Sequence, residues 1–295
     1  MKRIACILGE PSGWHARRLA SLLGARGFDP AIVPWRCLTA EVASQGESFG
    51  PPDFAHADVV AVRGMPGTSP SDSRLEEVIV RMDVLTRLAN RGTPVVNPPR
   101  ALEIAIDKYL SLTLLAAAGL PVPRTIVAQD AAIATAAWET LGGDCVVKPL
   151  FGSRGRGITR CHSAEAAAET VSTTHGVAYL QEFIPHDGWD LRVLVVGERL
   201  FAMRRDAAPG GWITNLASGG SASRIELSRD QAEVARRAVA AVGASLAGVD
   251  LVATAEGRLV VLEVNAVPGW RGIEGLLGDG VGESVADHIA SLGRL

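Results

Sequence analysis

The sequence is short of lysine. Of its 29 lysine and arginine residues only Lys2, Lys108 and Lys148 are lysine, and 32 acidic residues bring the net charge to −3. The basic residues are spread along the chain, so the sequence lacks the concentrated positive surface that nucleic acids or anionic membranes require. We therefore expect no nucleic-acid partner and no membrane partner.

Cysteine and long apolar segments are also scarce. The four cysteines show no Cys-x-x-Cys spacing, which argues against a cysteine metal site, and in a chain of 295 residues they indicate reduced and mostly buried thiols rather than a disulfide framework. The longest uncharged apolar run, residues 109–123, is interrupted by Ser, Thr, Gly and Pro and is too short to cross a bilayer. The first ten residues do not resemble a signal peptide. These absences predict a cytoplasmic protein.

Strand and helix patterns alternate over about the first 97 residues. This alternation predicts a small parallel sheet with helices on its faces, a Rossmann-like α/β domain. One expected helix in it spans residues 72–90. No Gly-x-Gly-x-x-Gly follows the first strand, which disfavours a dinucleotide-dependent oxidoreductase, and the segment ILGEPSGWH at that place has no assigned role.

The pattern changes after Pro98 and Pro99. Two helical stretches and a strand pair around a glycine-rich loop come first, and mostly antiparallel strands with short connections follow. Ser228 begins a helix with a capping box formed with Gln231. Helices grouped with antiparallel strands indicate an α+β arrangement. The sequence thus divides into three expected parts: 1–97, 98–182 and 183–295.

The segment VVKPLFGSRGRGI places a lysine at the end of an apolar strand, just before the glycine-rich loop. Gly152, Gly155 and Gly157 permit close backbone approach to phosphate, although a tight hairpin without a ligand is the alternative. The loop is not a Walker A motif, in which the lysine follows the last glycine and a helix begins. Lys148 favours phosphate, because an unpaired buried ammonium is costly and a compact charge suits a phosphate oxygen. Lys108 is interpreted in the same way, against chance survival of lysine in an arginine-rich composition.

An acid and an amide alternate in the apolar segment LVVLEVNAVPG. Glu263 and Asn265 are two residues apart on the expected strand, so they point to the same face. Asp250 lies on the preceding strand, and the short turn between the two strands predicts that they pair and bring the three side chains together. Oxygen ligands on a rigid hairpin near a phosphate chain favour Mg²⁺, and a buried hydrogen-bonded cluster is the alternative.

The segment YLQEFIPHDGWDLR ends one expected strand and begins the next. The backbone of Gln181 to Ile184 is expected to offer unpaired N–H and C=O groups that match the edge of adenine. Asp190 and Arg192 alternate and face one side, and Arg205 ends the strand that follows. An arginine directed into the site would stabilise an oxyanion or a transferring phosphoryl group, although any one of these charges is more often a surface residue.

These motifs, in this order, resemble the ATP-grasp superfamily and, more closely, the RimK-type ATP-dependent α-L-glutamate ligases. The resemblance is strong from about Asn97 to the last residue and looser before it, where AVRG and RMDVLTRLANRGTPVVN carry it. It implies a two-subdomain ATP-grasp fold after a small N-terminal domain. The matching segments are AIDKYLS, LLAAAGLPVPRT, VVKPLFGSRGRGI, YLQEFI, DLRVLVVG, WITNLASGG, AGVDLV and LEVNAVPGWRGIE.

The resemblance implies that ATP phosphorylates an acceptor carboxylate, and that the amine of an amino acid, glutamate in most relatives, attacks the acylphosphate. It implies two Mg²⁺ (or Mn²⁺) ions, a glycine loop that closes as a lid, and a homo-oligomer, either a dimer or a tetramer. The implied metal ligands are Asp250, Glu263 and Asn265, and the implied oxyanion groups are Arg192 or Arg205 and the Gly219–Gly220 backbone. The implied nucleotide contacts are Lys108, Lys148, Gly152, Ser153, Gly155, Gly157, Gln181, Glu182, Phe183, Ile184, Asp190, Thr214 and Asn215.

The acceptor stays open, since relatives modify ribosomal protein tails, carrier proteins and several cofactors. KPLFGSRGRG looks closest to the cofactor-modifying, tetrahydromethanopterin glutamate ligase-like branch, so we expect a pterin-like acceptor. Some relatives carry arginine where this chain has Ile213, which weakens the transfer of a contact to that position. Two further functions are compatible with these motifs: a dipeptide or glutathione-type ligase, and a non-catalytic ATP-binding module. The three candidate metal ligands argue against the non-catalytic module.

Overall fold

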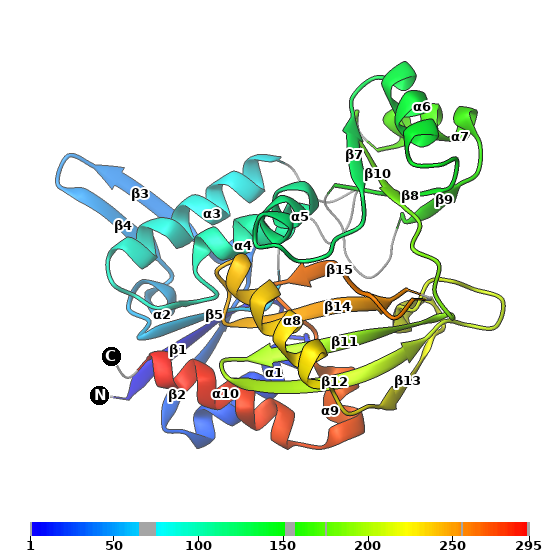
Figure 1. Ribbon diagram of the computed structural model, residues 1–295. Helices are drawn as coiled ribbons and strands as arrows, with labels where there is room; N and C mark the ends of the chain where they lie inside the picture. Colours follow the sequence, from blue (N-terminus) through cyan, green and yellow to red (C-terminus); the bar gives the residue numbers. More distant parts are fainter. Residues whose placement is uncertain (1, 65–74, 151–156, 175, 255, 294–295) are drawn as a thin grey trace.

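The structure is a computed structural model that describes residues 2–64, 75–150, 157–174, 176–254 and 256–293. In this part of the chain the strands form one parallel sheet, two antiparallel sheets and a separate hairpin (Figure 1). The predicted combination of α/β and α+β architecture is confirmed. None of the described helices is long and apolar enough to cross a membrane. All four cysteines are free, and three of them are buried.

The first sheet is parallel, as its alternating strands and helices predicted. The chain runs from β1 outward to β2 and then to β5 and β6 on the other side, so its winding reverses between β1 and β5. The strands in spatial order are β2 (Phe28–Val33), β1 (Arg3–Leu8), β5 (Val59–Val62) and β6 (Val95–Val96). The accompanying helices are α1 (Trp14–Ala25), η1 (Trp35–Cys37), α2 (Pro52–Ala55) and α3 (Leu75–Asn90).

Two features of this region differ from the sequence prediction. The helix expected over residues 72–90 is described from Leu75, and residues 72–74 lie outside the described residues. The hairpin of β3 (Thr39–Ala43) and β4 (Gly46–Gly50) was not predicted, and it projects from the parallel sheet (Figure 1). Every residue of β3 is exposed, so this strand lacks the alternation of buried and exposed residues by which strands are recognised.

The middle of the chain begins with two helices, α4 (Pro99–Ile106) and α5 (Lys108–Ala117). A small antiparallel sheet follows, with α6 (Ala131–Thr140) and α7 (Ala164–Thr173) packed on it (Figure 1). Its strands in spatial order are β7 (Thr125–Ala128), β10 (Ala178–Glu182), β8 (Cys145–Lys148) and β9 (Thr159–Cys161). The strands β8 and β9 flank the glycine-rich loop, whose residues 151–156 lie outside the described residues.

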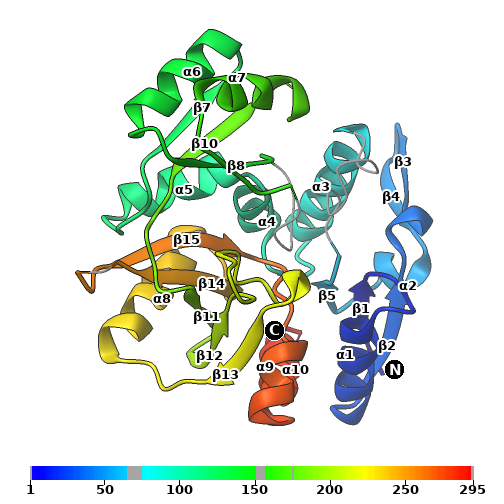
Figure 2. The same ribbon diagram turned by 90° about the vertical axis from the view of Figure 1, so that its right-hand side faces the viewer.

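The second antiparallel sheet forms the floor over which this small sheet lies (Figure 2). Its helix α8 (Arg229–Ala241) begins with the predicted capping box of Ser228 and Gln231. The strands in spatial order are β13 (Ser221–Arg224), β12 (Arg199–Asp206), β11 (Trp189–Val196), β14 (Leu246–Ala253) and β15 (Leu259–Asn265). The remaining helices are η2 (Leu216–Ser218), α9 (Arg271–Leu277) and α10 (Gly280–Leu292).

The parallel sheet and the five-stranded sheet are joined by a shared core and by one buried amide. A single apolar cluster combines Ile7 and Leu19 with Trp270 and Ile289. Asn97, which follows β6 and is fully buried, donates to the carbonyl oxygens of Leu246 (2.7 Å) and Ala266 (2.6 Å) and accepts from the N–H groups of Ser245 and Leu246. One side chain therefore connects the end of the parallel sheet to two strands of the other sheet.

We predict that Asn97→Ala lowers the free energy of unfolding by about 3 kcal/mol, because it leaves several buried backbone groups without partners. The measurement is urea unfolding followed by circular dichroism. Asn90→Ala is the matched control, since Asn90 is exposed at the end of α3, and it should change stability by less than about 0.5 kcal/mol. Equal stabilities of the two variants would show that the amide does not join the sheets.

Candidate active site

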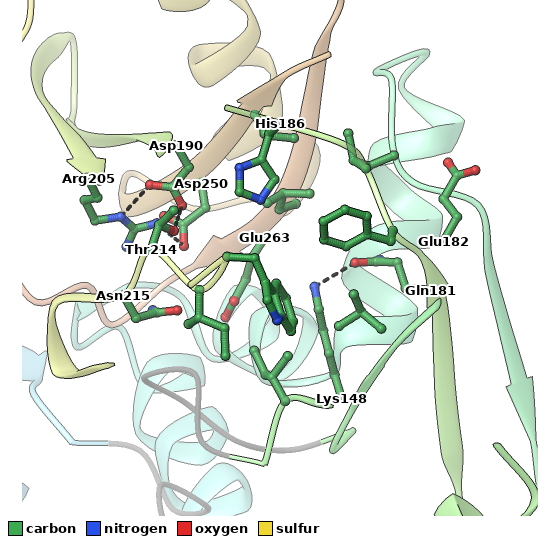
Figure 3. Close-up of a pocket in the computed structure, with 18 residues that line it drawn as sticks. Lys148, Gln181, Glu182, His186, Asp190, Arg205, Thr214, Asn215, Asp250 and Glu263 are labelled. Atoms are coloured by element: carbon green, nitrogen blue, oxygen red, sulfur yellow. Dashed lines mark hydrogen bonds and ion pairs between the residues drawn. The ribbon is translucent and has the colours of Figure 1, made fainter. Parts of the chain in front are cut away.

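A cleft of about 750 Å³ lies between the small antiparallel sheet and the five-stranded sheet (Figure 3). It brings together side chains that the sequence places far apart. The candidate site residues that line it are Lys148, Gln181, Glu182, Phe183, Ile184, Asp190, Arg205, Thr214, Asn215, Asp250 and Glu263. Of the other candidates, Gly152, Ser153 and Gly155 lie outside the described residues.

Lys148 ends β8 and projects into the cleft. Its Nζ donates to Oε1 of Gln181 at 2.6 Å, and the amide of Gln181 is held in turn by Oγ1 of Thr125 at 3.0 Å (Figure 3). Gln181 is neutral, and the ammonium forms no direct ion pair with a described carboxylate. Burial, together with the positive charge of Lys108 and despite the carboxylates of Glu263 and Asp250, lowers the pKa of Lys148 to about 8. The site therefore holds a buried cation that an anionic ligand would stabilise.

Lys108, at the start of α5, lines a smaller adjoining cavity. Its Nζ donates to the carbonyl oxygen of Leu150 at 3.3 Å, just beyond β8. Burial lowers the pKa of Lys108 as well, against the opposing effect of Glu263. Lys148 and Glu263 line both cavities, so the two lysines approach the same carboxylate from neighbouring spaces.

Two buried carboxylates and two buried guanidinium groups form a network on the floor of the cleft. Arg205 donates from Nε to Asp190 at 2.7 Å and also lies 3.1 Å from Asp250, while Arg192 donates to Asp250 at 2.7 Å. The hydroxyl of Thr214 donates to Asp190 at 2.7 Å. Burial alone would raise the pKa of Asp250, but Arg192 and Arg205 hold it below its usual value. Asp250 therefore stays ionised.

The predicted pairing of the strands that carry Asp250 and Glu263 is present, and these two residues are direct cross-strand partners. A β-bulge follows, because Leu251 pairs with Val261 and Leu262 is the extra residue. The bulge lets Leu262 and Glu263 both line the cleft while Val261 stays in the core. The bulge thus turns Glu263 toward the cleft beside Asp250.

The donors on these strands suit a hard cation in part. Glu263 forms no hydrogen bond or ion pair within 4 Å with any described residue, so its carboxylate faces the cleft beside Asp250 with both oxygens available. Asn265 is less clearly directed, since its Oδ1 accepts from the N–H of Val267 at 2.9 Å. Among the described residues no three His, Cys, Asp or Glu side chains are grouped as a metal cluster, so substrate oxygens would have to complete the coordination.

The end of β10 corrects one prediction. The N–H of Glu182 donates to the carbonyl oxygen of Arg124 at 2.9 Å, and that of Phe183 to the carbonyl oxygen of Asp144 at 3.4 Å, so these two groups are not unpaired. The N–H of Ile184 donates to no described residue and is available to a ligand. Backbone pairing thus continues one residue past the end of β10 at Glu182.

Apart from Phe183 and Ile184, the apolar and aromatic walls of the cleft were not predicted from the sequence. Trp212 lies edge-on to Phe183, with ring centroids 5.7 Å apart, and the ring of His186 lies 5.9 Å from that of Phe183. Ile213, noted only as a departure from relatives, also lines the cleft. The sequence offered two signals of an aromatic wall, Trp212 in WITN and Phe183 in EFIPH. They are 29 residues apart, and only the fold brings them together. The remaining apolar lining residues are Val146, Ile158, Val252 and Leu262.

Two candidate glycines lie where a side chain would not fit easily. Gly157 ends the glycine-rich loop with φ of +70° and a Cβ there would lie 3.0 Å from Pro149. A Cβ on Gly220 would lie 2.7 Å from the carbonyl oxygen of Asp206, so the chain after Thr214 passes close to β12. These positions require glycine for backbone reasons, whatever ligand they contact.

The comparisons with known proteins agree over nearly the whole chain. Residues 105–289 match the model of the RimK-like ATP-grasp domain. The tetrahydromethanopterin:α-L-glutamate ligase of Methanosarcina acetivorans is 32% identical over 99% of this chain and 100% of its own length. A probable α-L-glutamate ligase of Stenotrophomonas maltophilia is 33% identical over 98% of this chain and 99% of its own length.

Among solved structures, the ATP-grasp ligase PsnB complexed with a minimal precursor superposes with a TM-score of 0.76 at 27% identity, covering 99% of this chain and 100% of that one. A RimK domain protein from Sphaerobacter thermophilus, at 24% identity and a TM-score of 0.70, covers 98% of both chains and supports the fold. The chain therefore belongs to the RimK-like ATP-grasp family and is a ligase of the class that forms carbon–nitrogen bonds.

Proposed function

We propose that this ligase uses ATP and Mg²⁺ to join the amine of L-glutamate to the carboxylate of an acceptor, giving an amide bond, ADP and phosphate. One observation carries the proposal. The cleft places the ammonium of Lys148, which forms no direct ion pair with a described residue, opposite the cross-strand carboxylates Asp250 and Glu263. A cation for phosphate oxygens and carboxylates for a metal are the two requirements of phosphoryl transfer.

The nucleotide would lie along the cleft with its base against the aromatic wall. The N–H of Ile184 would donate to the adenine edge, and Phe183 and Trp212 would enclose the ring. Lys148 would donate to phosphate oxygens from the rigid end of β8, and Lys108 would support it from the adjoining cavity. The glycine-rich loop between β8 and β9 would cover the phosphates and exclude water.

Glu263 and Asp250, with Asn265, would hold Mg²⁺ between themselves and the phosphate chain. The metal would neutralise charge on the transferring phosphoryl group. A carboxylate oxygen of the acceptor attacks the γ-phosphorus, the bond to ADP breaks, and an acylphosphate forms. The first step thus converts a poor electrophile into one with a good leaving group.

In the second step the glutamate amine attacks the acyl carbon, the tetrahedral intermediate expels phosphate, and the amine nitrogen loses its proton. Arg205 lines the cleft beside Asp190 and Asp250 and is the arginine best placed to stabilise the oxyanion. Arg192 does not line the cleft but donates to Asp250, so it would act by holding that carboxylate in place.

The acceptor is proposed from the names of relatives. Two archaeal relatives that align with almost the whole chain are named tetrahydromethanopterin:α-L-glutamate ligases, and several bacterial ones are named probable α-L-glutamate ligases. We propose a pterin-like cofactor with a free carboxylate, with a ribosomal or carrier-protein tail as the alternative. The test is an ADP-release screen of pterin, peptide and protein acceptors with L-glutamate, followed by product mass. A mass gain other than glutamyl residues would refute the glutamate assignment.

We predict that Glu263→Gln lowers the rate of ADP release at least 100-fold, because it removes the carboxylate directed at the metal position. The affinity for Mg²⁺ should fall in parallel, which a magnesium titration of the remaining activity measures. Glu198→Gln, in the exposed turn between β11 and β12, is the control and should keep full activity. Unchanged magnesium dependence in Glu263→Gln would remove Glu263 from the metal site.

A second prediction concerns pH. The free protein has a Lys148 pKa of about 8, and only the protonated amine attracts phosphate. The Kd for a non-hydrolysable ATP analogue should therefore rise between pH 7 and pH 9, with most of the rise above pH 8. In Lys148→Arg the guanidinium stays protonated over this range, so the variant should bind more weakly but show little pH dependence. Calorimetry at fixed excess Mg²⁺ measures both, and parallel pH profiles would exclude Lys148 as the titrating group.

A further inference from the structure

Among the described residues, four buried side-chain atoms that should form hydrogen bonds have no partner. Three of them belong to one contact: Nε and Nη1 of Arg63 and Nε1 of Trp270. The fourth is Oε2 of Glu274, whose other oxygen pairs with Arg18 at 2.8 Å. Buried donors in native proteins nearly always have partners, so this concentration of unpaired donors requires an explanation.

Arg63 has an unusual environment for a buried charge. Its guanidinium lies over the indole of Trp270, with Cζ 4.3 Å from the ring centroid, and Nη2 donates to the carbonyl oxygen of Pro268 at 2.8 Å. No described carboxylate forms an ion pair with it. Burial lowers the pKa of Arg63 to about 9, which reflects the missing counter-charge. A buried charge without an anionic partner is costly, so this contact lacks the counter-charge that would stabilise it.

The position of Arg63 in the fold points the same way. Arg63 directly follows β5, and a Cβ on Gly9, which directly follows β1, would lie 3.2 Å from the Cβ of Arg63. The winding of the parallel sheet reverses between these two strands. In open parallel sheets, ligands bind outside the carboxyl ends of the strands at such a reversal.

The segment that meets Arg63 comes directly from the candidate metal site. Pro268 and Trp270 follow Asn265, the last residue of β15, within five positions. His15, at the start of α1, accepts hydrogen bonds at its Nε2 from the N–H groups of Trp270 (3.0 Å) and Arg271 (3.3 Å). The segment ILGEPSGWH, which had no assigned role, therefore holds Trp270 against Arg63.

We propose that Arg63 and the indole N–H of Trp270 form a subsite that binds a carboxylate group of a ligase substrate. The guanidinium supplies charge and two N–H donors, and the indole supplies a neutral donor beside it. This inference rests on the proposed function, in which the amino acid and the acceptor each carry carboxylates. The shared chemistry is a carboxylate, and kinetic measurements distinguish its source.

Arg63→Met tests the charge, and Arg3→Met is its matched control. The Arg3 guanidinium also lies over an aromatic ring, 4.4 Å from the centroid of Phe28, and donates to the backbone carbonyl of Gly293 at 3.2 Å. Arg3 begins β1, so it lies at the amino ends of the strands of the same sheet, whereas Arg63 lies at their carboxyl ends. Both substitutions therefore remove a cation–π contact and a hydrogen bond to a backbone carbonyl, but only Arg63→Met removes the unpaired donors.

We expect Arg63→Met to raise the KM for one substrate roughly 10- to 100-fold, because it removes a hydrogen-bonded ion pair with that substrate. The Kd for the ATP analogue should not change. Arg3→Met should change neither KM by more than about twofold. A rise in the KM for L-glutamate identifies the amino acid as the source of the carboxylate, and a rise in the KM for the acceptor found in the screen identifies the acceptor.

Trp270→Phe separates binding from packing. It keeps an aromatic ring under Arg63 and removes the buried unpaired N–H, but the smaller ring leaves a cavity at a fully buried position, so the melting temperature should fall modestly. We expect the KM for the same substrate to rise several-fold, as for the loss of one neutral hydrogen bond. A purely structural role of this contact would leave that KM unchanged.

Direct binding makes the outcome independent of turnover. L-glutamate and glutarate are titrated calorimetrically into the wild type and the three variants in the presence of Mg²⁺ and the ATP analogue. If no acceptor in the screen leads the enzyme to release ADP, the proposed function is refuted. Carboxylate binding that depends on Arg63 would still support the subsite in that case. Two outcomes would overturn the subsite. In the first, Arg63→Met and Trp270→Phe have the same two KM values and the same binding heats for L-glutamate and glutarate as Arg3→Met. In the second, the wild type binds neither probe and supports no turnover.

Discussion

The ionised carboxylate of Asp250 is the constraint around which the floor of the cleft is organised. A buried carboxylate is stable only when cations and hydrogen-bond donors surround it, and Arg192 and Arg205 supply them from β11 and β12. Arg205 in turn holds Asp190, which receives the hydroxyl of Thr214. Because these residues are cross-strand neighbours, the register of the five-stranded sheet determines the charge balance of the cleft.

A second constraint is the join between the parallel sheet and the five-stranded sheet. Asn97 and the shared apolar core hold the two sheets together, so the carboxyl edge of the parallel sheet faces the segment after β15. His15 and Arg63 reach that segment from the chain that follows strands β1 and β5. The N-terminal region therefore contributes directly to the surroundings of the site, beyond any role in stability.

Much of the site was predictable because its residues violate local expectations. Lys148 in an apolar strand and Glu263 in another stand out against their neighbours, and the short turn before Leu259 indicated the pairing that brings Glu263 beside Asp250. The ion pairs of Arg192 and Arg205 were not predictable, since a sequence shows that a charge is present but not which partner it has. The division into parts 1–97, 98–182 and 183–295, the oligomeric state and the number of metal ions stay predictions.

The sequence by itself determined the family, most of the order of strands and helices, and the chemical types of the candidate site residues, because local patterns of burial and charge record these. Only the tertiary structure decided which face Glu263 presents, through the bulge at Leu262, and which aromatic rings enclose the cleft. It also decided that Arg63 and Trp270 meet, although 207 positions (270 − 63) separate them in the chain. Unpaired donors can be recognised only when every neighbour is known, and neighbours that distant are set by packing rather than by local sequence.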